Sequence, residues 1–336
     1  MIYRILLWPH ANARYQAESV KLGRAELELT LRRVCPDAML TDQTESALPL
    51  LEFSAPEALT TEALRALSDF SLLYALFECA DGWMRPVVSR AEAYLGHDLP
   101  SILKYKGKTN EQFTALTQNV ALHSARFRLK PGERLRFLDP MCSRGTSLFL
   151  AVNRGWDADG GDISAPDIRE LNQFFKRYLE YHRFKHKIES KSFTVKGAKP
   201  VAATICQFAN DPEAFRMGET VTLRTAEGDC GKIAHCLNKS GYHIICCDLP
   251  YGIQHSAGKE TFEQLLRRVL PAWKNALVPG GSPALSFNIN TLPAAKVRAL
   301  MEQSGFEAQQ GVAYDRFPHW VEQAVTRDIA VGVRPE

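Results

Sequence analysis

Residues 134–155 read RLRFLDPMCSRGTSLFLAVNRG, and this stretch decides the predicted fold class. A short apolar run ends in the acidic residue Asp139, a tight turn follows, and a helix is predicted to begin at Thr146. Residues 156–163 repeat the strand and residues 166–184 repeat the helix. Strands that alternate with helices in this rhythm predict a parallel sheet with right-handed crossovers.

The same alternation resumes toward the carboxyl terminus, where the apolar stretch at 242–247 predicts a buried strand. Between the two blocks, an alternating pattern predicts a β-hairpin insertion near 185–225. The chain from 101 to 336 is therefore predicted to be an α/β domain with a doubly wound, mostly parallel, seven-stranded sheet. The remaining predicted elements are a helix at 262–277, a turn at 278–281, a strand at 283–289, a helix at 293–305 and closing strands up to 333.

The first hundred or so residues differ in pattern and predict a small α+β domain over 1–100. Apolar runs at 2–8 and 48–55 predict strands, residues 20–34 predict a helix, and 60–79 predict one helix or two. Turn residues around Pro86 and after it mark a linker. We place the domain boundary near residue 100 and expect the first domain to contribute to substrate binding.

Composition narrows the possible partners without selecting one. The formal net charge of +3 is compatible with a nucleic-acid partner, but it is far from a strongly basic balance. We find no apolar run of the roughly 18 residues that a spanning helix needs, so we expect a cytoplasmic protein without membrane contact. The eight cysteines are scattered without a CxxC pair, which argues against a zinc site and against a disulfide framework.

Acidic residues follow successive predicted strands at the edge where an open parallel sheet binds ligands. Asp139 ends the first strand, and Gly145 permits close approach of the backbone to a ligand before Thr146 begins the helix. Asp162 ends the next strand about 20 residues on, the place of an acid that holds ribose hydroxyls. Asp229, with the backbone of Cys230 beside it, is the candidate for recognising a base.

These acids have two other interpretations. Asp residues near turns commonly cap helices and strands, and each of these acids taken singly fits that role. A dinucleotide site would need the pattern G-x-G-x-x-G, which DPMCSRGT does not provide.

A second loop at the same edge has the composition of a catalytic loop. Asp248-Leu249-Pro250-Tyr251-Gly252 follows the apolar strand at 242–247. Carboxyl ends of parallel strands share one edge of a sheet, so this loop is expected beside Asp139. The plain alternative is a strand-to-turn segment in which proline and glycine are ordinary turn residues.

This loop resembles the acid-x-Pro-aromatic motif of amino-group methyltransferases, and its Leu-Pro form looks most like the THUMP-associated tRNA guanosine N2-methyltransferases. DPMCSRGT resembles their DPMCGxGT loop, and KYKGKTNEQFT resembles the segment that closes over the methionine end of their cofactor. The resemblance covers roughly residues 100–335. Ser143 departs from it at the motif's first glycine, and the first 100 residues are short for a THUMP domain.

The resemblance implies a Rossmann-like methyltransferase fold, S-adenosylmethionine as cofactor, no metal, and RNA, with tRNA favoured over DNA, as partner. The implied catalytic residues are Asp248, Leu249, Pro250 and Tyr251. The implied cofactor-binding residues are Asp139, Pro140, Cys142, Gly145, Thr146, Asp162, Ile163, Asp229 and Cys230, with Thr109 and Asn110 as weaker candidates.

Transfer to an exocyclic base amine would give each residue of the catalytic loop a task. The amine is a poor nucleophile, so Asp248 would accept one of its N–H groups and the carbonyl of Leu249 the other. Pro250 would fix the loop, and Tyr251 would stack on a base taken out of its helix. The leading hypothesis is methylation of guanosine N2 in RNA.

Other hypotheses stay open on the sequence alone. The same loop would present adenine N6 or cytosine N4 in DNA, and a binding module that lost activity through Ser143 is a third hypothesis. A lysine-rich stretch could contact RNA or be a solvated face. A mixed basic and aromatic segment near the end could form a base-binding rim or core packing. The lysines are Lys185, Lys187, Lys191, Lys196 and Lys199, and the segment contains Arg316, Phe317, His319 and Trp320.

Overall fold

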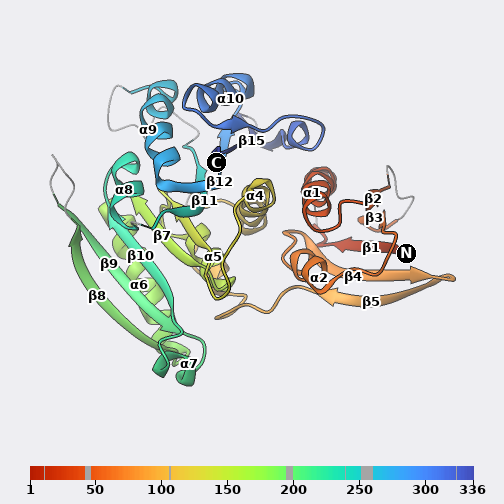
Figure 1. The fold of residues 1–336 in the computed structure, drawn as a ribbon, viewed down its shortest axis with the longest axis horizontal. Coiled ribbons are helices and arrows are strands. Elements are labelled where there is room, and N and C mark those ends of the chain that lie inside the picture. Colours follow the sequence, from red (N-terminus) through yellow and green to blue (C-terminus); the bar gives the residue numbers. More distant parts are fainter. Residues whose placement is uncertain are drawn as a thin grey trace.

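The computed structural model describes residues 1–10, 12–41, 47–105, 107–193, 200–238, 240–250, 260–322 and 324–336. Two β-sheets organise these residues, a small one from the amino-terminal part and a larger one from the rest (Figure 1). Helices α1 and α4 lie side by side between the two sheets in Figure 1.

The amino-terminal sheet is antiparallel, in the order β2-β3-β1-β4-β5. Its strands β1, β3 and β4 and its two helices bury a core that includes Ile5, Phe53 and Leu67. This confirms a small α+β unit. Its elements are β1 (Ile2–Leu7), α1 (Ala13–Val34), β2 (Met39–Leu40), β3 (Leu50–Ser54), α2 (Thr61–Ser68), β4 (Leu73–Ala80) and β5 (Trp83–Ser89).

Two local predictions for this unit were wrong. Residues 60–79 are helical only in their first part: α2 ends at Ser68, and Leu73–Ala80 is a strand that pairs with β1. The stretch around Pro86 is not a linker but strand β5, paired with β4. A continuous apolar run suits a helix and a buried strand equally, and here pairing with neighbouring strands decides.

The larger sheet contains the predicted alternation. In order across the sheet, its main strands are β10-β7-β6-β11-β12-β15-β13, which is 3-2-1-4-5-7-6 in chain order. The pairs among β10, β7, β6, β11 and β12 are parallel, and β15 runs antiparallel to β12. The predicted doubly wound, mostly parallel, seven-stranded α/β sheet is therefore confirmed. These strands are β6 (Arg136–Asp139), β7 (Asp157–Asp162), β10 (Val221–Glu227), β11 (Tyr242–Asp248), β12 (Leu277–Asn288), β13 (Glu307–Ala308) and β15 (Val325–Val333).

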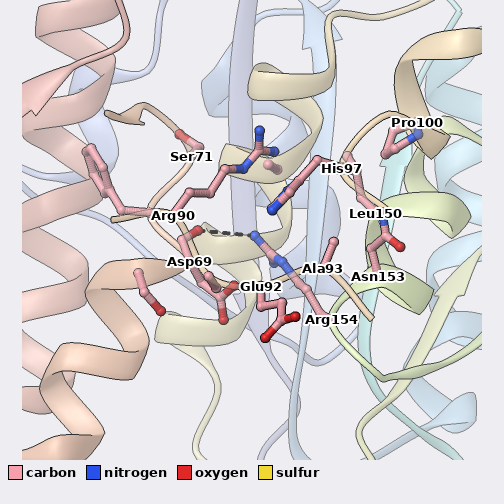
Figure 2. A pocket seen from close by; sticks show the side chains of 14 residues that line it. Asp69, Ser71, Arg90, Glu92, Ala93, His97, Pro100, Leu150, Asn153 and Arg154 are labelled. Atoms are coloured by element: carbon pink, nitrogen blue, oxygen red, sulfur yellow. Dashed lines mark hydrogen bonds between the residues drawn. The ribbon is translucent and has the colours of Figure 1, made fainter. Parts of the chain in front are cut away.

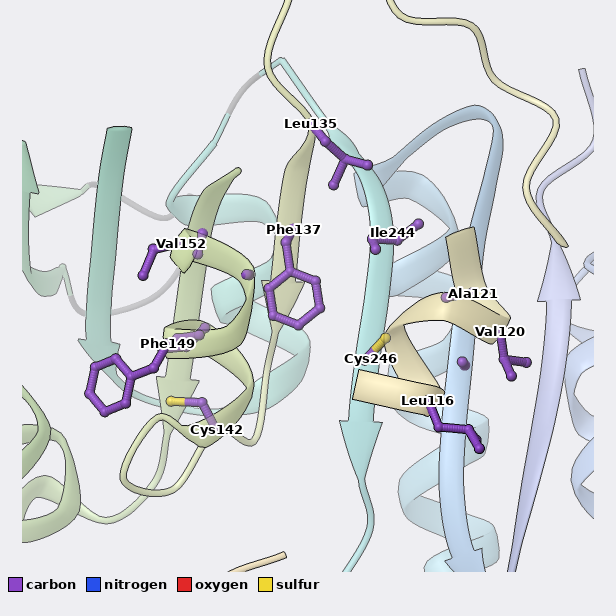
Figure 3. Close-up of a cluster of buried hydrophobic side chains, with 14 of the residues drawn as sticks. Leu116, Val120, Ala121, Leu135, Phe137, Cys142, Phe149, Val152, Ile244 and Cys246 are labelled. Atoms are coloured by element: carbon purple, nitrogen blue, oxygen red, sulfur yellow. The ribbon is translucent and has the colours of Figure 1, made fainter. Parts of the chain in front are cut away.

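Helices cover both faces of this sheet. Helices α4, α5 and α6 contribute to one buried cluster, and α8, α9 and α10 contribute to a second cluster on the other face. Figure 3 shows part of the first cluster, with Leu116 and Val120 on α4, Ile244 on β11, Phe137 on β6 and Phe149 on α5. The helical elements are α3 (Leu99–Ile102), α4 (Glu111–Ser124), α5 (Thr146–Asn153), α6 (Ala165–Tyr181), α7 (Pro212–Arg216), α8 (Cys230–Cys236), α9 (Phe262–Ala276), α10 (Ala294–Gln303) and the 3-10 turn η2 (Tyr314–Arg316).

The predicted insertion is a hairpin at one edge of the sheet. Strand β8 (Lys185–Phe193) pairs antiparallel with β9 (Val201–Ala209), and β9 pairs antiparallel with β10. The insertion is shorter than predicted, because Val221–Glu227 belongs to the main sheet and pairs parallel with β7. The predicted turn at 278–281 is a bulge inside β12. A short strand, β14 (His319–Glu322), pairs with β15.

The amino-terminal unit is packed onto the larger one through α1. Leu22, Ala25 and Leu29 of α1 belong to the same buried cluster as Leu116 and Val120 of α4. Among the described residues, we find no helix with the length and apolar content needed to span a membrane.

Candidate functional site

The loop from β6 to α5 holds its acid in a buried position. Asp139 ends β6 and is 6% exposed. Its carboxylate accepts a hydrogen bond from the Met141 N–H at 3.0 Å and another from the Ser147 hydroxyl. Pro140 and Cys142 are also buried, and the Cys142 N–H donates to the Gly161 carbonyl at 2.8 Å. The loop is therefore fixed before any ligand binds.

Two residues of this loop have a left-handed backbone. Gly145 caps α5 at φ 88°, and a Cβ there would meet Leu171 at 2.7 Å, so glycine is required at this position. Ser143 has φ 47°, a conformation that favours glycine. The departure from the motif at Ser143 thus leaves the turn geometry in place.

Asp162 supports the same loop from the neighbouring strand. It ends β7, and its carboxylate accepts hydrogen bonds from the Ser143 N–H at 2.9 Å and the Ser164 N–H at 2.8 Å. Ile163, beside it, is 70% exposed. The first two acids predicted from the sequence therefore lie at one carboxyl edge, joined through the backbone of Ser143.

The segment before α4 lies across this edge. The Tyr105 hydroxyl contacts the Thr146 hydroxyl at 3.2 Å and also interacts with the side chain of Ser143. The Arg144 guanidinium lies 5.1 Å from the centre of the Tyr105 ring. Ser143 therefore provides a contact that glycine could not.

Asp248 ends β11 and is held on both carboxylate oxygens. Oδ1 accepts from the Ser286 hydroxyl at 2.8 Å, and Oδ2 accepts from the Thr109 hydroxyl. The Arg327 guanidinium lies 3.9 Å from Oδ2. The Leu249 N–H donates to the Ser286 carbonyl at 2.8 Å, so the backbone after Asp248 is fixed as well.

The rest of the predicted catalytic loop is only partly described. Leu249 is 3% exposed, and Pro250 directly follows it. Tyr251 and Gly252 lie outside the described residues.

The carboxylate of Asp139 lies within the influence of two other acids at this edge. Burial raises the pKa of Asp139 to about 7, and the charges of Asp162 and Asp248 add to the increase. Burial also raises the pKa of Asp162. A cation bound among these groups would stabilise their charged forms, so the cluster suits a positively charged ligand.

Asp229 and Asn110 have capping roles, which is one of the interpretations that the sequence left open for the acids. Asp229 is the N-cap of α8 and accepts from the Gly231 N–H at 3.1 Å. It also forms an ion pair of 2.9 Å with Arg268. The backbone carbonyl of Cys230, beside it, accepts from Trp273 Nε1 at 3.1 Å. The side chain of Asn110 caps α4 by accepting from the Gln112 N–H at 2.8 Å.

Several residues that hold the acids were missed from the sequence. Asp139 accepts from Ser147, which lies in the helix that follows it. Asp248 contacts Ser286 and Arg327, which come from strands distant in the sequence. A serine at the carboxyl end of β12 and an arginine in β15 carry no local motif. The register of β11 against β12 places Asp248 opposite Ser286, and the register of β12 against β15 places Arg327 opposite Asn288.

A cavity of about 140 Å³ lies between the two units, and Asp248, although not among its lining residues, contacts one of them, Arg327. The cavity is lined mainly by apolar and aromatic side chains of α1, α4 and β14. Through Arg327, it reaches the same edge of the sheet as the acids.

A smaller cavity of about 50 Å³ lies at the junction near the other end of α5. Figure 2 shows the side chains of Arg90, His97 and Arg154 directed toward one another in it. Arg154 donates to the Asp69 carbonyl at 3.3 Å, the dashed line in Figure 2. Its lining includes none of the acids of the carboxyl edge.

Within the described ranges we find no group of three or more histidine, cysteine or acidic residues able to hold a metal ion. On the hairpin, Lys187 and Lys191 both form ion pairs with Glu189. Lys196 and Lys199 lie outside the described residues. Contact of the hairpin with RNA stays a prediction.

Neither a protein-family model nor a curated protein matches this sequence. Among solved structures, a methyltransferase from Pyrococcus furiosus aligns with 70% of this chain and 89% of its own, at 11% identity and a TM-score of 0.43. The rRNA methyltransferase aviRa from Streptomyces viridochromogenes covers 70% of this chain and 90% of its own, at 14% identity and a TM-score of 0.41. A magnesium protoporphyrin IX methyltransferase from Synechocystis, solved with bound SAM, covers 68% and 86%, at 15% identity and a TM-score of 0.38. These likenesses are remote, and the architecture is defined by the strand order of this chain's own sheet.

Proposed function

We propose that this chain is an S-adenosylmethionine-dependent methyltransferase that modifies an exocyclic amino group of a nucleic-acid base, with guanosine N2 in RNA as the leading target and tRNA as the favoured substrate. The observation that carries the proposal is the cluster of Asp139, Asp162 and Asp248 at one carboxyl edge of a doubly wound sheet. The fixed Asp248-Leu249-Pro250 loop lies in the same place.

The acids fit the cofactor by charge. S-adenosylmethionine carries an ammonium and a sulfonium, and the buried carboxylate of Asp139 and the partly buried one of Asp162 are a favourable surrounding for both. We assign Asp139, at the end of β6, to the ammonium and Asp162, at the end of β7, to the ribose hydroxyls. This is the order of strand ends in nucleotide-binding sheets. Tyr105 and Thr109 cross the edge above them. Cys230 and Asp229 remain the candidates beside the adenine.

When bound, the cofactor supplies an electrophilic methyl group. The carboxylate of Asp248 then accepts one N–H of the target amine, while the Leu249 carbonyl accepts the second. Ser286 and Thr109 hold both oxygens of Asp248, so the acceptor does not rotate away from the amine. As the nitrogen would take the methyl carbon, the sulfur–methyl bond of the sulfonium would break with its electron pair left on the thioether sulfur, the amine would lose a proton, and Asp248 is placed to receive it.

The amino-terminal unit and the hairpin are the parts of the chain that this chemistry does not use. We propose the unit over residues 1–100 as a contributor to substrate binding, because α1 lines the cavity beside Asp248.

The test is transfer of labelled methyl from S-adenosylmethionine to total RNA and, separately, to genomic DNA, followed by nucleoside analysis. We expect label in N2-methylguanosine. Asp248→Asn should lower kcat by about 10²–10⁴-fold while cofactor affinity stays close to that of the wild type, because only the amine side changes. Label in a DNA base would replace the RNA assignment.

A matched control is Asp157→Asn, which changes the same functional group at the opposite end of β7. There the side chain accepts from the Thr222 N–H at 2.8 Å, and an amide oxygen can do the same. This variant should turn over normally. Near-normal kcat in Asp248→Asn would refute the catalytic assignment.

A further inference from the structure

The cavity beside Asp248 combines flat apolar walls with a buried cation. Residues of both units line it, among them Tyr15 and Leu22 of α1, Phe113 of α4, and Trp320 of β14. Arg327 of β15 is only 7% exposed and also lines it. A ligand for this cavity therefore has a flat ring and a hydrogen-bond acceptor.

The position of Arg327 connects the cavity to the acceptor carboxylate. Its guanidinium lies 4.7 Å from the centre of the Phe113 ring and 3.9 Å from Asp248 Oδ2. Arginine donates hydrogen bonds and accepts none. If a base places its exocyclic amine at Asp248, the ring atom next to that amine would therefore face the Arg327 guanidinium, which can donate to it.

The wall formed by His319 is a neutral aromatic surface. His319 Nδ1 lies 2.9 Å from the Phe317 carbonyl, so this nitrogen carries the hydrogen. Its ring lies 4.8 Å from that of Phe113, and burial lowers the pKa of His319 to about 4. The two rings already pack against each other, so this wall is aromatic and adds no charge at neutral pH.

One side of the cavity carries aromatic side chains, of which Trp320 contacts Arg14, and the acidic side chain of Glu18 also lines the cavity. The Arg14 guanidinium lies 3.6 Å from the centre of the Trp320 ring, and the Tyr15 ring lies 6.1 Å from it. Tyr15 is 42% exposed. Arginine beside exposed aromatic rings is the combination that single-stranded nucleic acids bind, by phosphate contact and base stacking.

We propose that this cavity binds the target base of a single-stranded nucleic acid, and that Arg327 orients the base by donating to the ring nitrogen next to the target amine. The inference rests on the proposed function for the position of the amine. In guanine that nitrogen is N3, an acceptor. The ring would lie among Phe113, His319 and Trp320, and the amine would reach Asp248.

The first test measures binding of a fluorescein-labelled, mixed-sequence single-stranded RNA 12-mer to the full chain at fixed salt. Trp320→Ala and Tyr15→Ala should each raise Kd by about tenfold, in line with the loss of one stacking contact. Cofactor affinity should not change. Trp83→Ala is the matched control, because Trp83 is 81% exposed in β5 and does not line the cavity, and its Kd should equal that of the wild type.

The second test measures the contribution of Arg327 to binding. It combines a variant at Arg327 with an oligonucleotide in which one atom of the target base is changed. An oligonucleotide in which the target guanosine is 3-deazaguanosine lacks the N3 acceptor. Arg327→Met should weaken binding of the guanosine oligonucleotide and leave that of the 3-deaza oligonucleotide unchanged. Equal weakening for both would refute the role of Arg327.

Failure of the inference and failure of the proposed function give different results. If Asp248→Asn abolishes transfer while Trp320→Ala and Tyr15→Ala keep wild-type Kd and KM, the cavity is not the base site and the function stands. If the wild type transfers no methyl group but both variants lose RNA binding, the base site stands and the enzymatic proposal fails.

Discussion

At the scale of single residues, the titration of Asp139 makes cofactor binding depend on pH. Its pKa of about 7 in the free protein means that it is mostly protonated at pH 6. Binding an ammonium requires the carboxylate form, so bound cofactor lowers this pKa. We expect the affinity for S-adenosylmethionine to fall from pH 7 to pH 6 and below, by at most about tenfold per pH unit. Isothermal titration calorimetry at several pH values below 7 measures this, since an α-amino group stays protonated there.

The control for this prediction is Asp139→Asn, which keeps the shape of the side chain and removes its charge. The variant should bind more weakly at pH 7, and its affinity should change much less with pH. A wild-type affinity that is constant between pH 6 and pH 7 would contradict the assignment of Asp139 to the ammonium.

At the scale of elements, the turn between β6 and α5 depends on Gly145. An alanine there would have a left-handed backbone, which costs about 1–2 kcal/mol, and its Cβ would meet Leu171 at 2.7 Å. Crowding of this kind adds about 1–3 kcal/mol. We expect Gly145→Ala to lower the free energy of unfolding by the sum of both terms and to weaken cofactor binding, as urea denaturation and calorimetry would show.

A second glycine separates the two contributions. Gly82 has φ 81°, and no atom lies within 4 Å of the place that a Cβ would take, so Gly82→Ala adds backbone strain without crowding. It should cost only about 1–2 kcal/mol and leave the cofactor affinity unchanged. Equal losses in both variants would show that the Leu171 contact relaxes at no cost.

The elements also show what the sequence could predict. Periodicity and the acids at strand ends predicted β6, α5, β7 and β11 and the common edge of Asp139, Asp162 and Asp248. They did not predict β4, because Leu73–Ala80 is apolar without a clear period and becomes a strand by pairing with β1. Nor did they predict the bond from Thr109 to Asp248, which joins residues 139 positions apart.

At the scale of the whole molecule, a buried acid joins the two units. Glu26 of α1 is 0% exposed and accepts from the Asn119 side chain of α4 at 2.6 Å. It also accepts from the Ser71 N–H at 2.9 Å and from the Ser71 hydroxyl. Burial raises the pKa of Glu26. Glu26 contacts Asn119 of α4, and the N-cap of the same helix directly follows Thr109, which donates to Asp248. Helix α4 therefore connects the contact at Glu26 with Asp248.

We therefore expect the two units to unfold together and Glu26 and Asn119 to be energetically coupled. Glu26→Ala leaves buried donors without an acceptor, and Asn119→Ala removes one of those donors, so the double variant should lose less stability than the sum of the single variants. The coupling energy should be about 1–3 kcal/mol, measured by urea denaturation in a double-mutant cycle. The partly exposed pair Arg4 and Glu52, within the first sheet at 2.7 Å, is the control and should couple by less than about 1 kcal/mol. Two separate unfolding transitions in the wild type, or additive losses at Glu26 and Asn119, would mean that the amino-terminal unit folds and moves independently of α4, and that it does not hold the cavity beside Asp248 in shape.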